Sequence, residues 1–183
     1  MSRFTLPLIL FALLVVVLGI GIKQSPEKDL IPSPLIGKTA PQFSLPNLTD
    51  PGQRVSSAQL RGHWYLFNVW GTWCGSCRVE QPMLLKIRQS GLIPLVGLDW
   101  KDDDSDALSY LKAQGDPYQT IAVDHDGSEA IMWGVYGAPE TFLVSPQGIV
   151  VYKFIGPITE QDWEQQILPR LPMGRTPATA ASS

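Results

Sequence analysis

Residues 67–78 read Phe-Asn-Val-Trp-Gly-Thr-Trp-Cys-Gly-Ser-Cys-Arg, an apolar run that ends in a Trp-Cys-x-x-Cys turn. Cys74 and Cys77 in this turn are the only two cysteines of the chain. The next residues predict a helix, because four apolar side chains fall at helical spacing, namely Val79, Met83, Leu84 and Ile87. The two thiols are therefore expected where a strand ends and a helix begins.

That position favours thiol chemistry. The first N–H groups of a helix are unpaired and carry partial positive charge, so they stabilise a thiolate at Cys74. Cys77 lies one turn later, within reach of a mixed disulfide formed at Cys74. We therefore predict Cys74 as the nucleophile, Cys77 as the resolving thiol, and a Cys74–Cys77 disulfide as the oxidised state.

Two other uses of the cysteine pair stay open, a zinc site and a purely structural disulfide. Zinc needs three or four protein ligands, and His63 and His125 do not have ligand spacing to the cysteines. A structural disulfide here would close a very small loop, and small loops give the least stabilisation. The strand, turn and helix context favours a redox-active pair.

The N-terminal stretch Phe4–Ile22 contains no charged side chain and is almost wholly aliphatic from Leu6 onward. As a helix it would span about 28 Å, enough to cross a bilayer core, with Arg3 keeping the N-terminus in the cytoplasm. A cleaved signal peptide is the alternative, although the end of the run lacks a clear cleavage pattern of small residues. We expect an uncleaved transmembrane helix and export of the remaining chain into an oxidising compartment.

The chain of 183 residues is expected to have four parts. These are a membrane anchor (1–23), a proline-containing tether (24–35), one folded domain (36–171) and a disordered tail (172–183). The formal net charge is −3 and the exported part has no basic patch, so a nucleic acid partner is not expected.

Within the folded domain, predicted strands and helices alternate and the last two strands form a hairpin. Strands are expected at 42–45, 64–70, 93–98, 120–123, 141–144 and 149–154, and helices at 56–60, 78–89, 104–114, 128–133 and 159–168. The order predicts an α/β layer fold with a central mixed β-sheet flanked by helices. Aspartates at 99–106 are expected to cap the helix start near Ser105 rather than to bind a cation.

A resemblance to the thioredoxin superfamily rests on residues 73–77, Trp-Cys-Gly-Ser-Cys, on the strand before them and on Pro82 after them. Residues 134–143, Gly-Val-Tyr-Gly-Ala-Pro-Glu-Thr-Phe-Leu, are more specific. They resemble the membrane-anchored thiol:disulfide interchange proteins of cytochrome c maturation, the CcmG/DsbE type. The resemblance also includes residues 67–70, residues 77–80 and the N-terminal anchor, and it covers roughly residues 6–168.

The resemblance implies a thioredoxin-like fold in which Pro139 is a cis-proline beside the cysteines. A cis bond would leave the backbone of Ala138 free to pair with a client strand next to Cys74. The alternative is a trans proline that begins the following strand. Glu140 is expected to add negative charge near the site.

Glu80 matches the acid that lies near the cysteines in the CcmG-like branch, and it would accept a proton from Cys77. Its alternative role is that of a solvated helix residue that pairs with Arg78 or Lys86. Asn68 occupies a position where many thioredoxins carry a buried acid. The other residues implied to shape the site are Trp73, which would shield Cys74 from water, and Gly75 and Ser76, where family members often have a proline.

The family resemblance implies a protein-disulfide reductase that acts on the heme-attachment disulfide of apocytochrome c, without a cofactor or metal. Its partners would be apocytochrome c, the heme-ligation machinery and a membrane thiol reductant that supplies electrons. Its location would be the bacterial inner membrane, with a single span and the catalytic domain in the periplasm.

Other functions remain open. The same thiols would oxidise a client if the potential were high, so a general thioredoxin-like reductase or oxidase of exported proteins is the first alternative. From a different class, a metal or heme-handling chaperone would use Cys74 and Cys77 as ligands.

Overall fold

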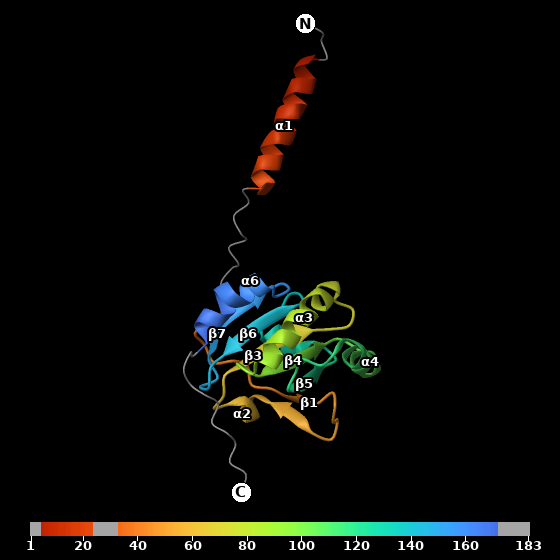
Figure 1. The fold of residues 1–183 in the computed structure, drawn as a ribbon, viewed down its shortest axis with the longest axis vertical. Helices are drawn as coiled ribbons and strands as arrows, with labels where there is room; N and C mark the ends of the chain where they lie inside the picture. The colour runs from red at the N-terminus through yellow and green to blue at the C-terminus, as the bar shows by residue number, and fades with distance from the viewer. Residues whose placement is uncertain (1–4, 24–32, 172–183) are drawn as a thin grey trace. The chain divides into compact units, whose positions relative to one another are not determined.

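The computed structural model describes residues 5–23 and 33–171 (Figure 1). The chain divides into two units, residues 1–32 and residues 33–183. Most of the predicted tether (24–35) and the whole predicted tail (172–183) lie outside the described residues. The four predicted domain boundaries therefore stay a prediction.

The first unit contains one helix, α1, which runs over Thr5–Lys23 where the apolar N-terminal helix was expected. Its apolar side chains are exposed, and Ile9, Phe11 and Leu13 each have more than half of their surface accessible. Among the described residues, no helix reaches the length and apolar character that a membrane span requires, and α1 is included in that finding. The predicted helix is present, and its predicted span is not found.

The second unit is built on a five-stranded mixed sheet in the order β5-β4-β3-β6-β7 (Figure 1). The strands are β3 (Tyr65–Trp70), β4 (Leu95–Trp100), β5 (Thr120–Asp124), β6 (Glu140–Val144) and β7 (Val150–Ile155). Strands β3, β4 and β5 run parallel, whereas β6 pairs antiparallel with β3 and with β7. All six residues of the central strand β3 are buried, as expected for an apolar strand covered on both faces. The predicted α/β fold with a central mixed sheet is confirmed.

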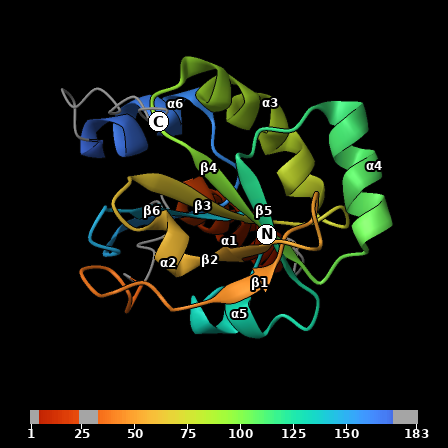
Figure 2. The ribbon, with the colours of Figure 1, turned by 90° about the horizontal axis from the view of Figure 1, so that it is seen from below.

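Helices cover both faces of this sheet (Figure 2). The helices of the domain are α2 (Ser57–Leu60), α3 (Gly75–Ser90), α4 (Asp104–Gln114), α5 (Ser128–Met132) and α6 (Glu160–Asp162). Strand β3 alternates between the two cores. Leu66 and Trp70 pack with α3 and α4 residues, and Phe67 and Val69 pack with residues of α5.

The apolar residues of helix α3 mark its buried face only in part. Val79 is 73% exposed, whereas Cys77, Glu80, Leu84 and Ile87 are buried. The buried residues keep helical spacing but begin at Cys77 and include a carboxyl group. The helix predicted from this spacing is confirmed, but the apolar residues do not define its buried face, which leaves out Val79 and includes Glu80.

Two further elements differ from prediction. Strand β2 (Arg54–Ser56) pairs antiparallel with β1 (Ser44–Pro46), and no strand was predicted at the position of β2. Three residues are too few to show an alternating pattern, and Pro51 and Gly52 give the preceding segment the residue pattern of a turn.

The predicted last helix is broken into α6, a π-helical turn (Trp163–Ile167) and a 3₁₀ turn (Leu168–Arg170). Its start is as predicted, because Thr159 and Asp162 form a capping box.

We predict that Phe67→Ala lowers the free energy of unfolding by about 3–5 kcal/mol. Phe67 has no exposed surface, and its ring stacks on Trp133 with centroids 4.2 Å apart, so truncation leaves a cavity at the centre of one core. Urea unfolding measures the change. Val79→Ala is the matched control, since Val79 is exposed, and it should change stability by less than about 0.5 kcal/mol. Equal losses for both variants would contradict this assignment of the core.

Candidate active site

The two cysteines lie where strand β3 gives way to helix α3. Cys74 is the N-cap residue of α3, and the backbone N–H of Cys77 donates to its sulfur at 3.1 Å. The two sulfurs form a disulfide, with the Cα atoms 5.3 Å apart, and both residues are buried. When this bond is reduced, the unpaired N–H groups of the first helical turn stabilise a thiolate at Cys74.

The turn before Cys74 is tied to two neighbouring elements. Asp102 accepts hydrogen bonds from the backbone N–H of Thr72 and from its hydroxyl, the latter at 2.7 Å. The Arg78 side chain donates to the Thr72 carbonyl at 2.9 Å. The Trp73 indole donates to the Trp100 carbonyl at 2.9 Å. These contacts fix the direction in which the chain enters α3.

Gly71 is required by the position of the Trp73 ring. A Cβ atom at Gly71 would lie 2.5 Å from the indole nitrogen of Trp73, which is closer than nonbonded atoms approach. The ring therefore lies against the backbone of the turn, while 52% of the Trp73 surface stays exposed. Gly75 and Ser76 follow at the surface as the first residues of α3, and open space surrounds the Cβ position at Gly75.

Glu80 lies one helical turn after Cys77 and is almost completely buried. One carboxylate oxygen accepts from the Asn68 amide at 2.6 Å, and the other accepts from the backbone N–H of Ile158 at 3.0 Å. Burial raises the pKa of Glu80 to about 7, although both hydrogen bonds act in the opposite direction. The alternative of a solvated helix residue is wrong. Lys86 instead pairs with Glu160 at the surface.

Asn68 connects Glu80 to two further elements. Its amide also donates to the Thr141 hydroxyl at 2.9 Å, and its carbonyl accepts from the Tyr118 hydroxyl at 2.7 Å. Burial raises the pKa of Tyr118 well above its ordinary value, so the phenol stays a donor. The residue singled out as a departure from many thioredoxins therefore lies at the centre of a buried polar network.

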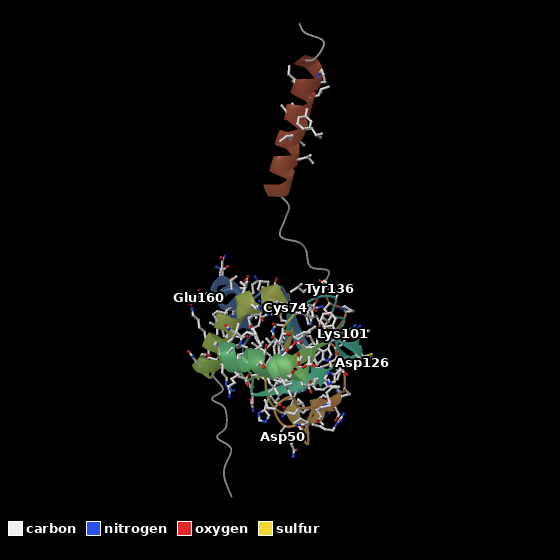
Figure 3. The ribbon with its side chains drawn as sticks, turned by 90° about the vertical axis from the view of Figure 1, so that its right-hand side faces the viewer. Asp50, Cys74, Lys101, Asp126, Tyr136 and Glu160 are labelled. Carbon is white, nitrogen blue, oxygen red and sulfur yellow. A yellow bond between two sulfur atoms is a disulfide. The ribbon has the colours of Figure 1, made fainter. Side chains whose placement is uncertain are left out.

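The Ala138–Pro139 peptide bond is cis. It leads directly into β6, where Glu140 lies opposite Val69 of β3. Ala138 packs against the hydrophobic core that contains both cysteines. In Figure 3, Cys74 and Tyr136 both lie toward one end of the domain, and Asp50 lies toward the other end. The structure thus brings together the two segments on which the family resemblance rests.

Glu140 is buried, and its charge is paired. Lys153 of β7 lies 2.8 Å from its carboxylate, and both side chains are shielded from water. Burial raises the pKa of Glu140, and the contact with Lys153 partly offsets that effect. The Lys153 amine also donates to the Gly134 carbonyl at 2.9 Å and lies over the ring of Tyr136. The negative charge predicted at Glu140 is present but compensated.

Two residues that contact the site, Lys153 and Tyr118, and the buried Asp99 were not predicted from the sequence. The sequence did contain a signal for Lys153, because it is the one charged residue within the strand Val150–Ile155. Asp99 was grouped with the helix-capping aspartates, whereas the structure buries it at the end of β4. Asp103 is the residue that caps α4, by accepting a hydrogen bond from the Ser105 N–H at 2.8 Å.

The described residues contain no group of three or more side chains that could together bind a metal ion.

Comparison with known proteins identifies the family. The family model described as Redoxin matches residues 35–167. This chain belongs to the Redoxin family. It is 44% identical over 168 residues to the thiol:disulfide interchange protein DsbE of Allochromatium vinosum, and the match covers 92% of each chain. DsbE of Pseudomonas aeruginosa is 42% identical over 164 residues, which cover 90% of this chain and 89% of that relative.

Solved structures support the same family. A crystal structure of a Chlorobium tepidum protein described as DsbE-type has a TM-score of 0.63 and 29% identity to this Redoxin chain. The match covers 74% of this chain and 97% of that chain. The protein is therefore a member of the thioredoxin superfamily of the DsbE/CcmG type, with a thioredoxin-like fold. Together with the Cys74–Cys77 pair, these matches support a thiol:disulfide oxidoreductase.

We predict that Lys153→Met in this Redoxin protein lowers the free energy of unfolding by about 3–5 kcal/mol, because it leaves the buried Glu140 carboxylate unpaired. Urea unfolding near neutral pH measures the loss. Adding Glu140→Gln should recover part of it. Lys86→Met is the control, since its ion pair with Glu160 is exposed, and it should cost less than about 1 kcal/mol. A loss at Lys153 no larger than at Lys86 would contradict the argument.

We also predict that Glu80→Gln removes the contribution of Glu80 to the pH dependence of the disulfide-exchange rate near pH 7. Glu80 takes up a proton as the pH falls through about 7, and the neutral acid no longer accepts a proton from Cys77. The wild-type rate should therefore fall more steeply below that pH than ionisation of the Cys74 thiol alone explains, whereas the variant should be slower and keep only the dependence that thiol ionisation causes. Glu160→Gln, at an exposed position on α6, is the control. If Glu80→Gln has the same pH profile of the exchange rate as wild type, Glu80 has a structural role and does not accept the proton.

Proposed function

We propose that this protein reduces disulfides in exported proteins, and that its client is the heme-attachment Cys-x-x-Cys disulfide of an apocytochrome c. The observation that carries the proposal is the Cys74–Cys77 pair at the start of α3, with Cys74 as the N-cap. The DsbE relatives support disulfide exchange. The choice of client rests on the CcmG/DsbE resemblance of residues 134–143.

The proposed exchange has two steps and transfers two electrons. First, the Cys74 thiolate attacks one sulfur of the client disulfide, that S–S bond breaks, and the released client thiolate takes up a proton. A mixed disulfide then joins Cys74 to the client. Second, Cys77 loses its proton, with Glu80 as the acceptor, and attacks the Cys74 sulfur. This breaks the mixed disulfide, and the client thiolate that it releases takes up a proton. The client leaves with two thiols, and the protein leaves with the Cys74–Cys77 disulfide.

The client strand is proposed to pair with the backbone of Ala138 beside cis-Pro139. Ala138 packs against the core that contains the cysteines, which supports this placement. Trp73, Gly75 and Ser76 are exposed around the disulfide and would contact the client there. In this proposal Glu140 acts through its pairing with Lys153, which holds the loop over residues 134–140.

We place the catalytic domain (36–171) on the periplasmic side of a bacterial inner membrane. Residues 1–23 would be the anchor, residues 24–35 the tether, and residues 172–183 a free tail. The support is the absence of charge from Phe4 to Ile22, the 19-residue helix α1 with exposed apolar side chains, and the DsbE names of the relatives. A membrane thiol reductant would return electrons to the disulfide, and the heme-ligation machinery would receive the reduced client.

Two alternatives lead to different outcomes of one experiment. A general thiol exchanger would react with many exported proteins. A metal or heme-handling chaperone would bind its ligand through Cys74 and Cys77 in the reduced protein and turn over little disulfide.

We predict that Cys77→Ser, expressed with the N-terminal segment intact, accumulates mixed disulfides between Cys74 and apocytochrome c in cells. The variant lacks the resolving thiol, so the first intermediate is not released. Non-reducing electrophoresis and mass spectrometry of the linked partners measure the result. The double variant Cys74→Ser/Cys77→Ser is the control and should capture nothing.

The captured partners decide between the candidates. Apocytochrome c or components of heme ligation support the dedicated role. A wide set of exported proteins would replace it with general exchange. If abundant protein captures no partner and the purified reduced protein holds stoichiometric metal or heme, the chaperone replaces both.

A further inference from the structure

Thr72 lies two residues before Cys74, and all three of its hydrogen-bonding groups are held by charged side chains. Asp102, which follows β4, accepts hydrogen bonds from the backbone N–H of Thr72 and from its hydroxyl, the latter at 2.7 Å. The guanidinium group of Arg78 donates to the Thr72 carbonyl at 2.9 Å. The residue that leads into the cysteine turn is therefore fixed from two sides.

The hydrogen bond from Arg78 closes a ring of the chain around both cysteines. Arg78 directly follows Cys77, and Thr72 precedes Cys74 by two residues, so the whole Cys-x-x-Cys segment lies inside this ring. The disulfide closes a smaller ring within it. The Arg78 bond involves no sulfur atom, so reduction of the disulfide leaves both of its partners in place.

Helix α3 fixes Cys77 but does not fix the residues before the helix. Cys77 lies within α3, whereas Cys74 is the N-cap residue and has extended backbone angles. In the reduced protein the position of the Cys74 sulfur relative to Cys77 therefore depends on what holds the preceding turn. The contacts of Thr72 supply that hold, because Arg78 belongs to the same helix as Cys77.

We infer that Arg78 and Asp102 hold Thr72 so that the two reduced thiols keep the geometry of the disulfide, which favours disulfide formation. Closing a ring costs chain entropy, and a restraint on the surrounding segment removes part of that cost. The Cys77 thiolate then attacks the Cys74 sulfur of the mixed disulfide faster, the bond to the client breaks, and the client thiolate leaves and takes up a proton. Arg78 and Asp102 are positioning residues, since they act through Thr72, and the inference rests on the proposed reductive role.

The positive charge of Arg78, acting alone, would have the opposite effect on the disulfide. A cation near Cys74 stabilises the thiolate and hence the reduced state, so its removal would make the disulfide harder to reduce. Loss of the hydrogen bond to Thr72 should instead make the disulfide easier to reduce. The sign of the change in the redox equilibrium therefore separates positioning from electrostatic stabilisation.

The test measures the equilibrium constant for oxidation of Cys74 and Cys77 by glutathione disulfide in the full-length protein. Wild type and Arg78→Met are equilibrated with mixtures of reduced and oxidised glutathione, and free thiols are alkylated and counted by mass spectrometry. The constant should fall by about fivefold in Arg78→Met, the effect of one lost hydrogen bond. An unchanged or increased constant would overturn the inference.

Arg88→Met is the matched control. It makes the same substitution at an exposed arginine in the last turn of the same helix, far from the cysteines. The constant for Arg88→Met should equal that of wild type. A fall as large as that of Arg78→Met would overturn the inference, because it would show a general effect of removing positive charge from α3. Circular dichroism establishes that each variant is folded.

A neutral substitution tests the contact with Asp102 and covers the case in which Arg78→Met does not fold. Thr72→Val removes the hydroxyl that donates to Asp102, and Thr72→Ser retains it. Thr72→Val should lower the equilibrium constant by about threefold, and Thr72→Ser should recover it. A wild-type constant in Thr72→Val would overturn the role of Asp102.

This equilibrium contains no client, so its outcome is distinct from the outcome for the proposed function. A wild-type disulfide that oxidises reduced glutathione almost completely would contradict the reductive role. The ratio between the constants of wild type and variants tests only the positioning of the two thiols.

Discussion

The buried hydrogen bond between Asn68 and Glu80 is the interaction on which the site depends. It joins the central strand β3 to the helix that begins at Cys74, and Asn68 extends the connection to Tyr118 and Thr141. The second oxygen of Glu80 binds the backbone of Ile158, before α6. Leaving one of these buried polar groups without a hydrogen-bond partner would cost free energy. Each residue of the network therefore holds the others in position.

The acids around the cysteines are buried in three different ways. Glu80 receives neutral donors, Glu140 is paired with Lys153, and the two oxygens of Asp99 have no hydrogen-bond partner among the described residues. Only Glu140 has a fixed opposite charge beside it, whereas burial brings the pKa of Glu80 and of Asp99 near the working range of thiols. A dithiol that exchanges electrons must also exchange protons, and we propose Glu80 as the group that accepts one from Cys77.

The parts of the fold that could be predicted from the sequence are those that depend on the pattern of neighbouring residues. The apolar run of β3 and the cysteine turn indicated a strand, a turn and a helix, and the capping box at Thr159 located the start of α6. These patterns did not predict burial where contacts between distant parts of the chain determine it. Val79 fits an apolar helix face but is exposed, and Glu80 is buried only because Asn68 and Ile158 offer donors. Lys153 and Asp99 are likewise buried by partners distant in sequence or by strand register, which a single sequence does not reveal. The cis bond at Pro139 was implied by family resemblance rather than by spacing.

The most direct test of the account is the direction of electron transfer between the wild-type protein and a client. The reduced protein would be mixed with an oxidised peptide that carries the heme-attachment sequence Cys-x-x-Cys-His, and all thiols would be trapped and counted by mass spectrometry. The account predicts that the peptide gains two thiols as Cys74 and Cys77 lose theirs, in a one-to-one ratio. The result that would contradict it is an oxidised peptide left intact by the reduced protein, together with oxidation of the reduced peptide by the Cys74–Cys77 disulfide.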